Sequence, residues 1–425
     1  MTDFATLPHG AVTLANLTVP ACLVDETGDL IRTDISIAGG KISDPQTSVI
    51  NMGGAMVFPA FADMHTHLDK GHILPRAPNP DGTFMGALNT VAADRAARWA
   101  AHDVRRRMEF SLHCAYAHGT RAIRTHLDSI PPQHQISFPV FREIQADWTG
   151  RIDLQAVNLI PSDLGGPNGP LPDIAAEVSK TKGGVLGMVT RPSTDLSDIL
   201  RHFFHVAEKH GLPTDFHVDE TLDPSVETLR TIAEVVIETG FAHTVTVGHC
   251  CSLSTQDETR AMNTLDLVAQ AGLCVVSLPM CNLYLQDRTM PGHPRTPRHR
   301  GITLVHEMRA RGIPVSFASD NTRDPFYAYG DMDMVEVMRE ATRIGHLDHA
   351  RPDWITAFTT LPFSVMDMPI PTLHHGAPAY LVICKARSWA ELFARPQSDR
   401  IVLRNGVPID RTLPDYSELD DLMEI

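Results

Sequence analysis

This 425-residue chain has few cysteines, and their spacing is not that of a disulfide framework or a metal site. The seven cysteines are scattered, their number is odd, and none forms a Cys-x-x-Cys pair. This pattern argues against a disulfide framework and against a cysteine-based zinc site, and it is typical of a reducing compartment. No apolar run reaches the length of a membrane span, and the first ten residues lack the basic and apolar regions of a signal peptide. We therefore expect a cytoplasmic protein.

Positive charge is also in short supply. The chain has 36 Lys and Arg residues against 51 Asp and Glu residues, which gives a formal net charge of −15 at pH 7. Such a surface repels phosphate backbones and anionic lipid, so we expect neither nucleic acid nor a membrane surface as a partner. The negative net charge is compatible with a small neutral or cationic substrate. The hydrophobic fraction of 43% is ample for a folded core.

The Gly-x-Gly-x-x-Gly and P-loop motifs are absent, which removes support for a doubly wound open sheet. Instead, apolar and β-branched runs alternate with segments of helical spacing. We expect strands at residues 56–60, 121–126, 153–160, 184–189, 213–217, 244–249, 273–278 and 314–320. Eight alternating units of this size close most simply into a (β/α)8 TIM-like barrel.

The two ends of the chain have a different sequence pattern. Residues 11–58 and two late segments consist of short alternating runs broken by turns that contain glycine. Neither piece is long enough to bury a sheet face alone. We therefore expect one small β-sandwich domain built from residues 1–58 and 374–425, and a barrel domain over residues 59–373. Barrels of this size often associate, so a homo-oligomer is possible.

Histidine and carboxylate residues end several of the expected strands. His65 and His67 end the first, His217 ends the fifth, His249 the sixth and Asp320 the eighth. Residues two apart on a strand share a face, and the carboxyl ends of barrel strands converge on the mouth where barrel enzymes keep their chemistry. Imidazoles and a carboxylate gathered there suit one divalent ion, zinc or iron, which lowers the pKa of bound water.

Other polar residues near these strand ends have less certain roles. Glu220, three residues after His217, would lie beside such an ion without binding it, which suits a proton shuttle. Lys70 is open to two interpretations, a substrate contact or an ordinary loop cation. Gln286, after the seventh strand, is a candidate for contacting a substrate edge. His126 also ends a strand, but among 22 histidines we expect it to support or pack against its neighbours.

Four motifs carry a resemblance to a known family. They are His65-Thr-His67-Leu-Asp-Lys70, Phe216-His217-Val-Asp-Glu220, Gly248-His249-Cys250 and Ala318-Ser-Asp320-Asn321. With the split β-domain, they resemble the amidohydrolase superfamily over nearly the whole chain. Residues 283–288, 296–308 and 319–326 look specifically like its bacterial cytosine deaminase branch. The chain also resembles N-isopropylammelide isopropyl amidohydrolase and, in broad pattern, deaminases of pterins.

The resemblance implies a barrel, one zinc or iron ion and the hydrolysis of an exocyclic amine on a nitrogen heterocycle. It implies that the metal ligands are His65, His67, His217 and Asp320. It further implies that Glu220 moves the proton, that His249 polarises the substrate and that Asp320 also assists catalysis. The leading hypothesis is a deaminase of a cyclic amidine, cytosine or a related pyrimidine, that releases ammonia. The alternatives are a deaminase or amidohydrolase of a pterin or an s-triazine, and a catalytically silent metal-binding barrel.

The chain departs from the cytosine enzymes at positions expected to contact the substrate. Ser162 stands where those enzymes commonly carry Gln, Asn321 where they carry a second Asp, and Phe326 where they carry Trp. With Lys70 and Gln286, these three are the candidate substrate contacts. A polar contact changed at a buried site can shift discrimination by orders of magnitude, so the reaction class is better determined than the substrate.

Binuclear members of the superfamily use a carboxylated Lys at the end of the fourth strand. Here that strand reads Gly184-Val-Leu-Gly-Met-Val-Thr190, and Lys182 precedes it. We therefore expect a single metal ion.

Overall fold

The computed structural model describes residues 7, 10–289, 294–349 and 352–423. The chain divides into two compact units. The first contains Met1–Asp63, His113–Ala122 and Asp333–Pro414, and the second contains Met64–Leu112, Ile123–Met332 and Asp415–Ile425. Both units are therefore discontinuous in sequence. The predicted domain boundaries, at residues 58 and 374, remain a prediction.

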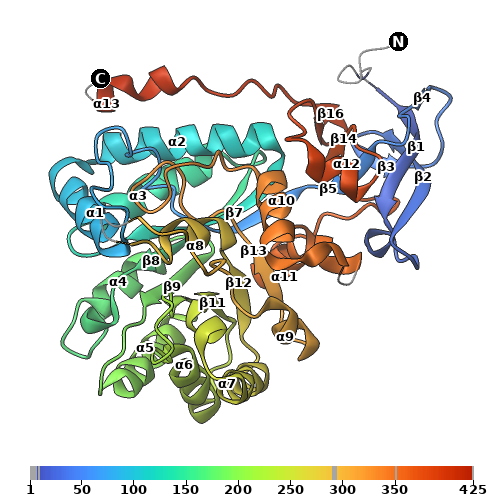
Figure 1. Ribbon diagram of the computed structural model, residues 1–425. Helices are drawn as coiled ribbons and strands as arrows, with labels where there is room; N and C mark the ends of the chain where they lie inside the picture. The colour runs from blue at the N-terminus through green and yellow to red at the C-terminus, as the bar shows by residue number, and fades with distance from the viewer. Residues whose placement is uncertain (1–6, 8–9, 290–293, 350–351, 424–425) are drawn as a thin grey trace. The chain divides into compact units, whose positions relative to one another are not determined.

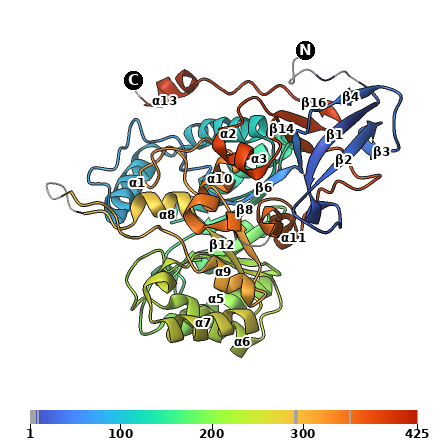
Figure 2. The ribbon, with the colours of Figure 1, turned by 45° about the vertical axis from the view of Figure 1, so that its right-hand side comes forward.

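Strands from both ends of the chain form one sheet in the first unit, in the order β16-β15-β14-β5-β1-β2-β3, with β4 paired to β1. They are β1 (Val12–Pro20), β2 (Leu30–Ala38), β3 (Lys41–Ser43), β4 (Val49–Asn51), β5 (Met56–Pro59), β14 (Leu381–Cys384), β15 (Ile401–Arg404) and β16 (Val407–Pro408). Figure 2 shows β1, β2 and β3 side by side. The first unit also contains α10 (Met334–Gly345), α11 (Thr360–Val365) and α12 (Trp389–Ala394).

The ends of the chain meet at β5. This strand pairs antiparallel with β14, through Val57 and Ile383 among others, and parallel with β1 at Thr18 and Met56. The prediction of one small β-sandwich built from both termini is thus confirmed, with its strands joined by hydrogen bonds into one sheet.

A second sheet contains eight strands in sequence order, from β6 to β13. They are β6 (Phe61–Thr66), β7 (Thr120–Asp128), β8 (Asp153–Leu159), β9 (Gly184–Val189), β10 (Thr214–Val218), β11 (Val245–His249), β12 (Cys274–Ser277) and β13 (Val315–Phe317). The β8–β13 pairings that are described are parallel. A parallel bridge between Thr66 and Asp320 joins the first strand to the last. The predicted barrel is confirmed.

One strand assignment needs correction. The run at residues 56–60 was expected to be the first barrel strand, but Met56–Pro59 is β5 of the terminal sheet. The barrel begins with β6 (Phe61–Thr66), which is separated from β5 by the single residue Ala60. A continuous apolar run bridges the two strands, so hydrophobicity alone does not mark the break at Ala60. The other expected strands each overlap an observed one.

Helices alternate with the barrel strands. They are α1 (Phe84–Arg98), α2 (Ala101–His118), α3 (His134–Asp147), α4 (Leu171–Val178), α5 (Leu196–His210), α6 (Thr228–Thr239), α7 (Glu258–Gln270), α8 (Pro279–Leu285) and α9 (Val305–Ala310). Figure 1 shows α4 to α7 side by side along the outside of the barrel strands. In the described part of the chain, no helix is long and apolar enough to cross a membrane.

The packing of α5 against β10 illustrates how the helices position the site. Phe203 on α5 meets Phe216 on β10, with ring centroids 4.9 Å apart. Side chains alternate between the two faces of a strand. Because Phe216 faces α5, the next residue, His217, lies on the opposite face of β10. Gly211 ends α5 with a φ of +64°, a left-handed conformation that glycine adopts without a Cβ penalty.

Candidate metal centre and active site

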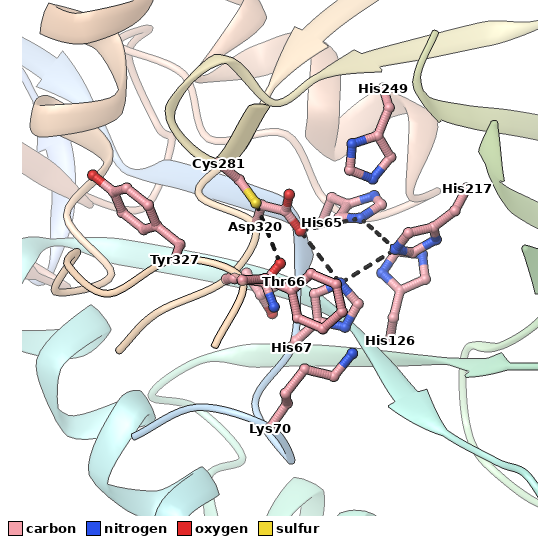
Figure 3. A network of polar contacts seen from close by, with 12 residues as sticks. His65, Thr66, His67, Lys70, His126, His217, His249, Cys281, Asp320 and Tyr327 are labelled. Carbon is pink, nitrogen blue, oxygen red and sulfur yellow. Dashed lines mark hydrogen bonds and ion pairs between the residues drawn. The ribbon is translucent and has the colours of Figure 1, made fainter. Parts of the chain in front are cut away.

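Four buried side chains converge at the carboxyl ends of the barrel strands (Figure 3). His217 Nε2 lies 3.2 Å from both His65 Nε2 and His67 Nε2. Asp320 Oδ1 lies 3.3 Å from His67 Nε2 and 3.7 Å from His65 Nε2. One ligand atom from each residue falls within 4.8 Å of the others, a spacing at which all four can hold one ion.

The strands position these residues directly. His65 lies in β6 and His217 in β10, while Asp320 follows β13 and donates its backbone N–H to the His65 carbonyl oxygen over 2.9 Å. Asp320 has a φ of +64°, and His249, at the end of β11, has a φ of +70°. Such angles are uncommon for residues other than glycine and cost of order 1–3 kcal/mol. Strain of this kind gathers at functional sites.

The chemistry of the four residues fits a divalent ion. Burial, followed by the neighbouring imidazoles, holds the pKa of His65 and His217 well below the ordinary value. Burial also lowers the pKa of His67, with Lys70 adding to the effect. These rings are therefore neutral, which is the form that binds metal. Three imidazole nitrogens and one carboxylate oxygen match the ligands of zinc or iron.

His126 lies beside this cluster. Its ring centroid is 4.0 Å from that of His65, and its Nε2 lies 3.3 Å from Asp215 Oδ1. Asp215 in turn accepts a hydrogen bond from Arg124 over 2.9 Å. This buried chain of contacts supports the histidine cluster from one side, as residues next to metal ligands commonly do.

Glu220 and His249 are joined by a residue that the sequence analysis missed. Asn282, on α8, donates from Nδ2 to Glu220 Oε1 over 3.2 Å and lies 3.1 Å from His249 Nδ1 through the same nitrogen. Its side chain is 1% exposed. Asn282 stands just before the segment singled out after the seventh strand, but no pattern in the sequence marks it.

Burial sets the protonation of both partners of Asn282. It raises the pKa of Glu220 well above the ordinary value, and Asp320 adds to that effect. Burial lowers the pKa of His249 to about 3. A raised pKa favours the protonated form of a carboxyl group, the form that can donate a proton, as in other enzymes that raise the pKa of a catalytic acid.

A cavity of about 310 Å³ opens onto this cluster. His67, His217, Glu220, His249 and Asp320 form its polar end. Its walls are largely apolar and include Phe84, Val91, Ile130, Pro161, Val189 and Phe326. The rings of Phe84 and Phe326 lie 5.5 Å apart at 70°. A concave apolar pocket with a few convergent polar groups is the usual form of a small-molecule site.

The structure separates the candidate substrate contacts into two groups. Lys70, Asn321 and Phe326 line the cavity. Ser162 lines a neighbouring cavity, where its Oγ accepts a hydrogen bond from the backbone N–H of Arg191. Gln286 directly follows α8 and is not part of the cavity wall. The sequence analysis also missed Asp128 and Arg95, which line the cavity beside Lys70.

Comparisons with known proteins agree with this geometry. Residues 184–410 match the model described as "Amidohydrolase family". The chain is 52% identical to a pterin deaminase of Rhizobium rhizogenes, over 99% of each sequence. It is 24% identical to an N-isopropylammelide isopropyl amidohydrolase of a Pseudomonas species, over 71% of this chain and 74% of the relative. The structure of a Klebsiella pneumoniae 5-methylcytosine deaminase with 5-fluorocytosine superposes with a TM-score of 0.77 at 21% identity, covering 95% and 98% of the two chains. The chain belongs to the amidohydrolase family.

Proposed function

We propose that this protein is a metal-dependent hydrolytic deaminase that releases ammonia from an aminated nitrogen heterocycle, and that a pterin is its leading substrate. The observation that carries the proposal is the placement of Glu220 and His249 beside the four ligand residues, at the polar end of a ring-sized cavity. The 52% identity to a pterin deaminase supports the substrate. Pterins therefore rank ahead of cytosine, for which the similarity is one of fold.

His65, His67, His217 and Asp320 would hold the ion. A divalent ion bound there would polarise water and lower its pKa towards neutrality. The pKa shifts of the three imidazoles favour their neutral, metal-binding form in advance, so binding needs little proton release from them.

Glu220 is positioned to transfer protons. It lines the cavity, and burial, followed by the charge of Asp320, raises its pKa well above the ordinary value, which favours the proton-donating form. A protonated Glu220 can donate its proton to a ring nitrogen of the substrate as water adds to the amine-bearing carbon. The resulting carboxylate can take up the proton that the water loses and pass it to the amine, which leaves as ammonia when the carbon–amine bond breaks.

His249 is oriented by Asn282. Burial raises the pKa of the Cys251 thiol above its ordinary value, so this thiol donates to Asn282 Oδ1 over 3.3 Å. This contact favours the orientation in which Asn282 Nδ2, 3.1 Å from His249 Nδ1, is the nearer amide atom, against 3.4 Å for Oδ1, and in that pairing Nδ1 accepts. In that pairing a neutral ring carries its proton on Nε2, which has no hydrogen-bond partner among the described residues. The N–H group of Nε2 can stabilise negative charge that develops on oxygen at the reacting carbon.

The cavity suits a flat heterocycle. Its volume of about 310 Å³ is at the lower end of the range for small-molecule sites. The faces of Phe84 and Phe326 offer contacts for an aromatic ring.

Ammonia release from a panel of pterins, cytosine and s-triazines, measured with metal-loaded protein, tests the proposal. Pterins are expected to give the highest kcat/KM. Cytosine turnover with a kcat/KM on the order of 10⁶ M⁻¹s⁻¹ or more, exceeding that for pterins, would overturn the substrate ranking. Full metal occupancy with no turnover of any member would favour the catalytically silent barrel.

A further inference from the structure

Lys70 places a buried ammonium group in the wall of the same cavity. The residue is 5% exposed and lines the cavity together with His67, His217 and Asp320. Figure 3 shows its side chain extending towards the His67 and His126 rings. Its Nζ also lies 5.2 Å from the centroid of the Phe326 ring. The ammonium group is therefore close to where a flat ring would lie.

The partner of Lys70 is held by a second cation. Lys70 Nζ lies 3.2 Å from Asp128 Oδ1, and Arg95 donates to Asp128 Oδ2 over 2.6 Å. The backbone N–H of Asp128 donates to Asp69 Oδ2 over 2.8 Å. Asp128 thus contacts two cations through its carboxylate and donates a hydrogen bond from its backbone. These contacts restrict the rotation of the Asp128 side chain, and so its ion pair holds Lys70 in place.

This arrangement leaves Lys70 with donors to spare. An ammonium group has three N–H donors and no acceptor. Within the described part of the chain, Asp128 is the residue that pairs directly with Lys70 Nζ, and Asp69 and Asp324 add only electrostatic attraction. Donors that stay unmatched in a buried site cost free energy. A ligand acceptor in the cavity would satisfy them.

We infer that Lys70, held by Asp128 and Arg95, recognises a ring carbonyl oxygen of the substrate, so that the enzyme selects amino-oxo heterocycles over amino heterocycles that lack the oxygen. This inference rests on the proposed function and deepens it. A second exocyclic amine would present donors to a group that can only donate. A carboxylate is less suited, because Asp128 already supplies a negative charge 3.2 Å from Nζ.

Two substrates that differ by this oxygen test the inference. They are 2-amino-4-oxopteridine and 2-aminopteridine, compared by kcat/KM for ammonia release with the parent protein, Lys70→Met and Lys182→Met. A site built around a hydrogen bond rejects a ligand that lacks the partner by large factors. We expect the parent to prefer the oxo compound by at least about a hundredfold. Lys70→Met should reduce that preference at least tenfold by slowing the oxo compound.

Lys182→Met is the matched control, because Lys182 is exposed and outside the cavity. Its preference should equal that of the parent. Metal content of Lys70→Met should stay near the parent value, because Lys70 is not one of the four ligand residues. Its melting temperature should fall, because the variant removes one partner of a buried ion pair, but the protein should still fold, because Arg95 still pairs with Asp128. Equal preference in Lys70→Met and the parent, or no preference in the parent, would overturn the inference.

A binding measurement separates this inference from the proposed function. Glu220→Gln blocks the proposed proton transfer, so the dissociation constants of both compounds can be measured without turnover, with and without Lys70→Met. If the parent turns over neither compound but the Glu220→Gln protein binds the oxo compound more tightly through Lys70, the proposed function fails and the inference stands. If the parent turns over both without a Lys70-dependent preference, the function stands and the inference fails. No binding of either compound overturns both.

Discussion

Asn282 donates to Glu220 Oε1 over 3.2 Å, and so ties the proposed proton shuttle to a short helix that follows the seventh barrel strand. The two residues are 62 positions apart in sequence. Because the same amide nitrogen also faces His249, one side chain orients both groups that would act on the substrate.

Replacing Asn282 therefore tests whether this orientation matters. Asn282→Ala should lower kcat by about 10–100-fold, since leaving a buried donor or acceptor without its partner costs about 1–3 kcal/mol. KM should change less, because the cavity walls stay intact. Steady-state kinetics with elemental analysis for metal provide the measurement. The control is Asn168→Ala, an exposed asparagine, which should behave as the parent. An equal loss in both variants, or loss of metal, would contradict the assignment.

The strand ends of this barrel could be predicted from sequence because two simple rules apply there. Apolar β-branched runs identify the strands, and parallel strands in a barrel bring their carboxyl ends together. From the sequence alone, these rules place His217, His249 and Asp320 near one another. They also gave the correct fold class, although the break between β5 and β6 at Ala60 was missed.

The contacts around the site could not be predicted in this way. Asn282 reaches Glu220 because α8 turns directly after β12, and that short helix has too few residues to show a period. Arg95 reaches Asp128 across 33 residues from a separate helix. Contacts of this kind depend on how helices and strands pack against one another. The hydrophobic pattern within one helix or strand carries no information about that packing.

The proposed metal ligands make a second prediction. His217→Ala should remove most bound metal and activity together, because His217 Nε2 lies 3.2 Å from two of the other ligand atoms. His126→Ala should weaken metal binding or activity by only about 10–100-fold, since it supports the cluster through Asp215. Metal content after dialysis and ammonia release are the two readouts. A His217→Ala protein with full metal occupancy would refute the ligand set.

A third prediction concerns stability in the first unit. Arg400 donates to both carboxylate oxygens of Asp333 over 2.6 Å each. Burial alone would raise the pKa of Asp333, but the Arg400 charge and its hydrogen bonds hold that pKa at about 2. A carboxyl group with a lowered folded-state pKa contributes stability above its unfolded pKa of about 3.9. That contribution is lost as pH falls through the folded value.

Asp333→Asn should therefore lower the free energy of unfolding by about 3 kcal/mol at pH 7, because it leaves the Arg400 charge buried without its partner. The difference from the parent should shrink as pH falls from about 4 to 2. Denaturant unfolding of both proteins across this range is the measurement, and Asp163→Asn, at an exposed aspartate, is the control. A difference that is constant with pH would contradict the role of the ion pair.

The proton shuttle gives the last prediction. Glu220 lies 3.5 Å from His249 Nδ1 at the polar end of the cavity, and burial keeps its pKa raised. Glu220→Gln keeps the shape and the contact with Asn282 but cannot transfer the proton. General acid–base catalysis typically contributes about 10²–10⁴-fold, so the variant should fold, bind metal and bind substrate, yet turn over at least roughly a hundredfold more slowly. If Glu220 were an ordinary loop carboxylate, the rate would stay within a few fold of the parent. A near-normal rate with normal metal content would reject the mechanism and leave the fold assignment untouched.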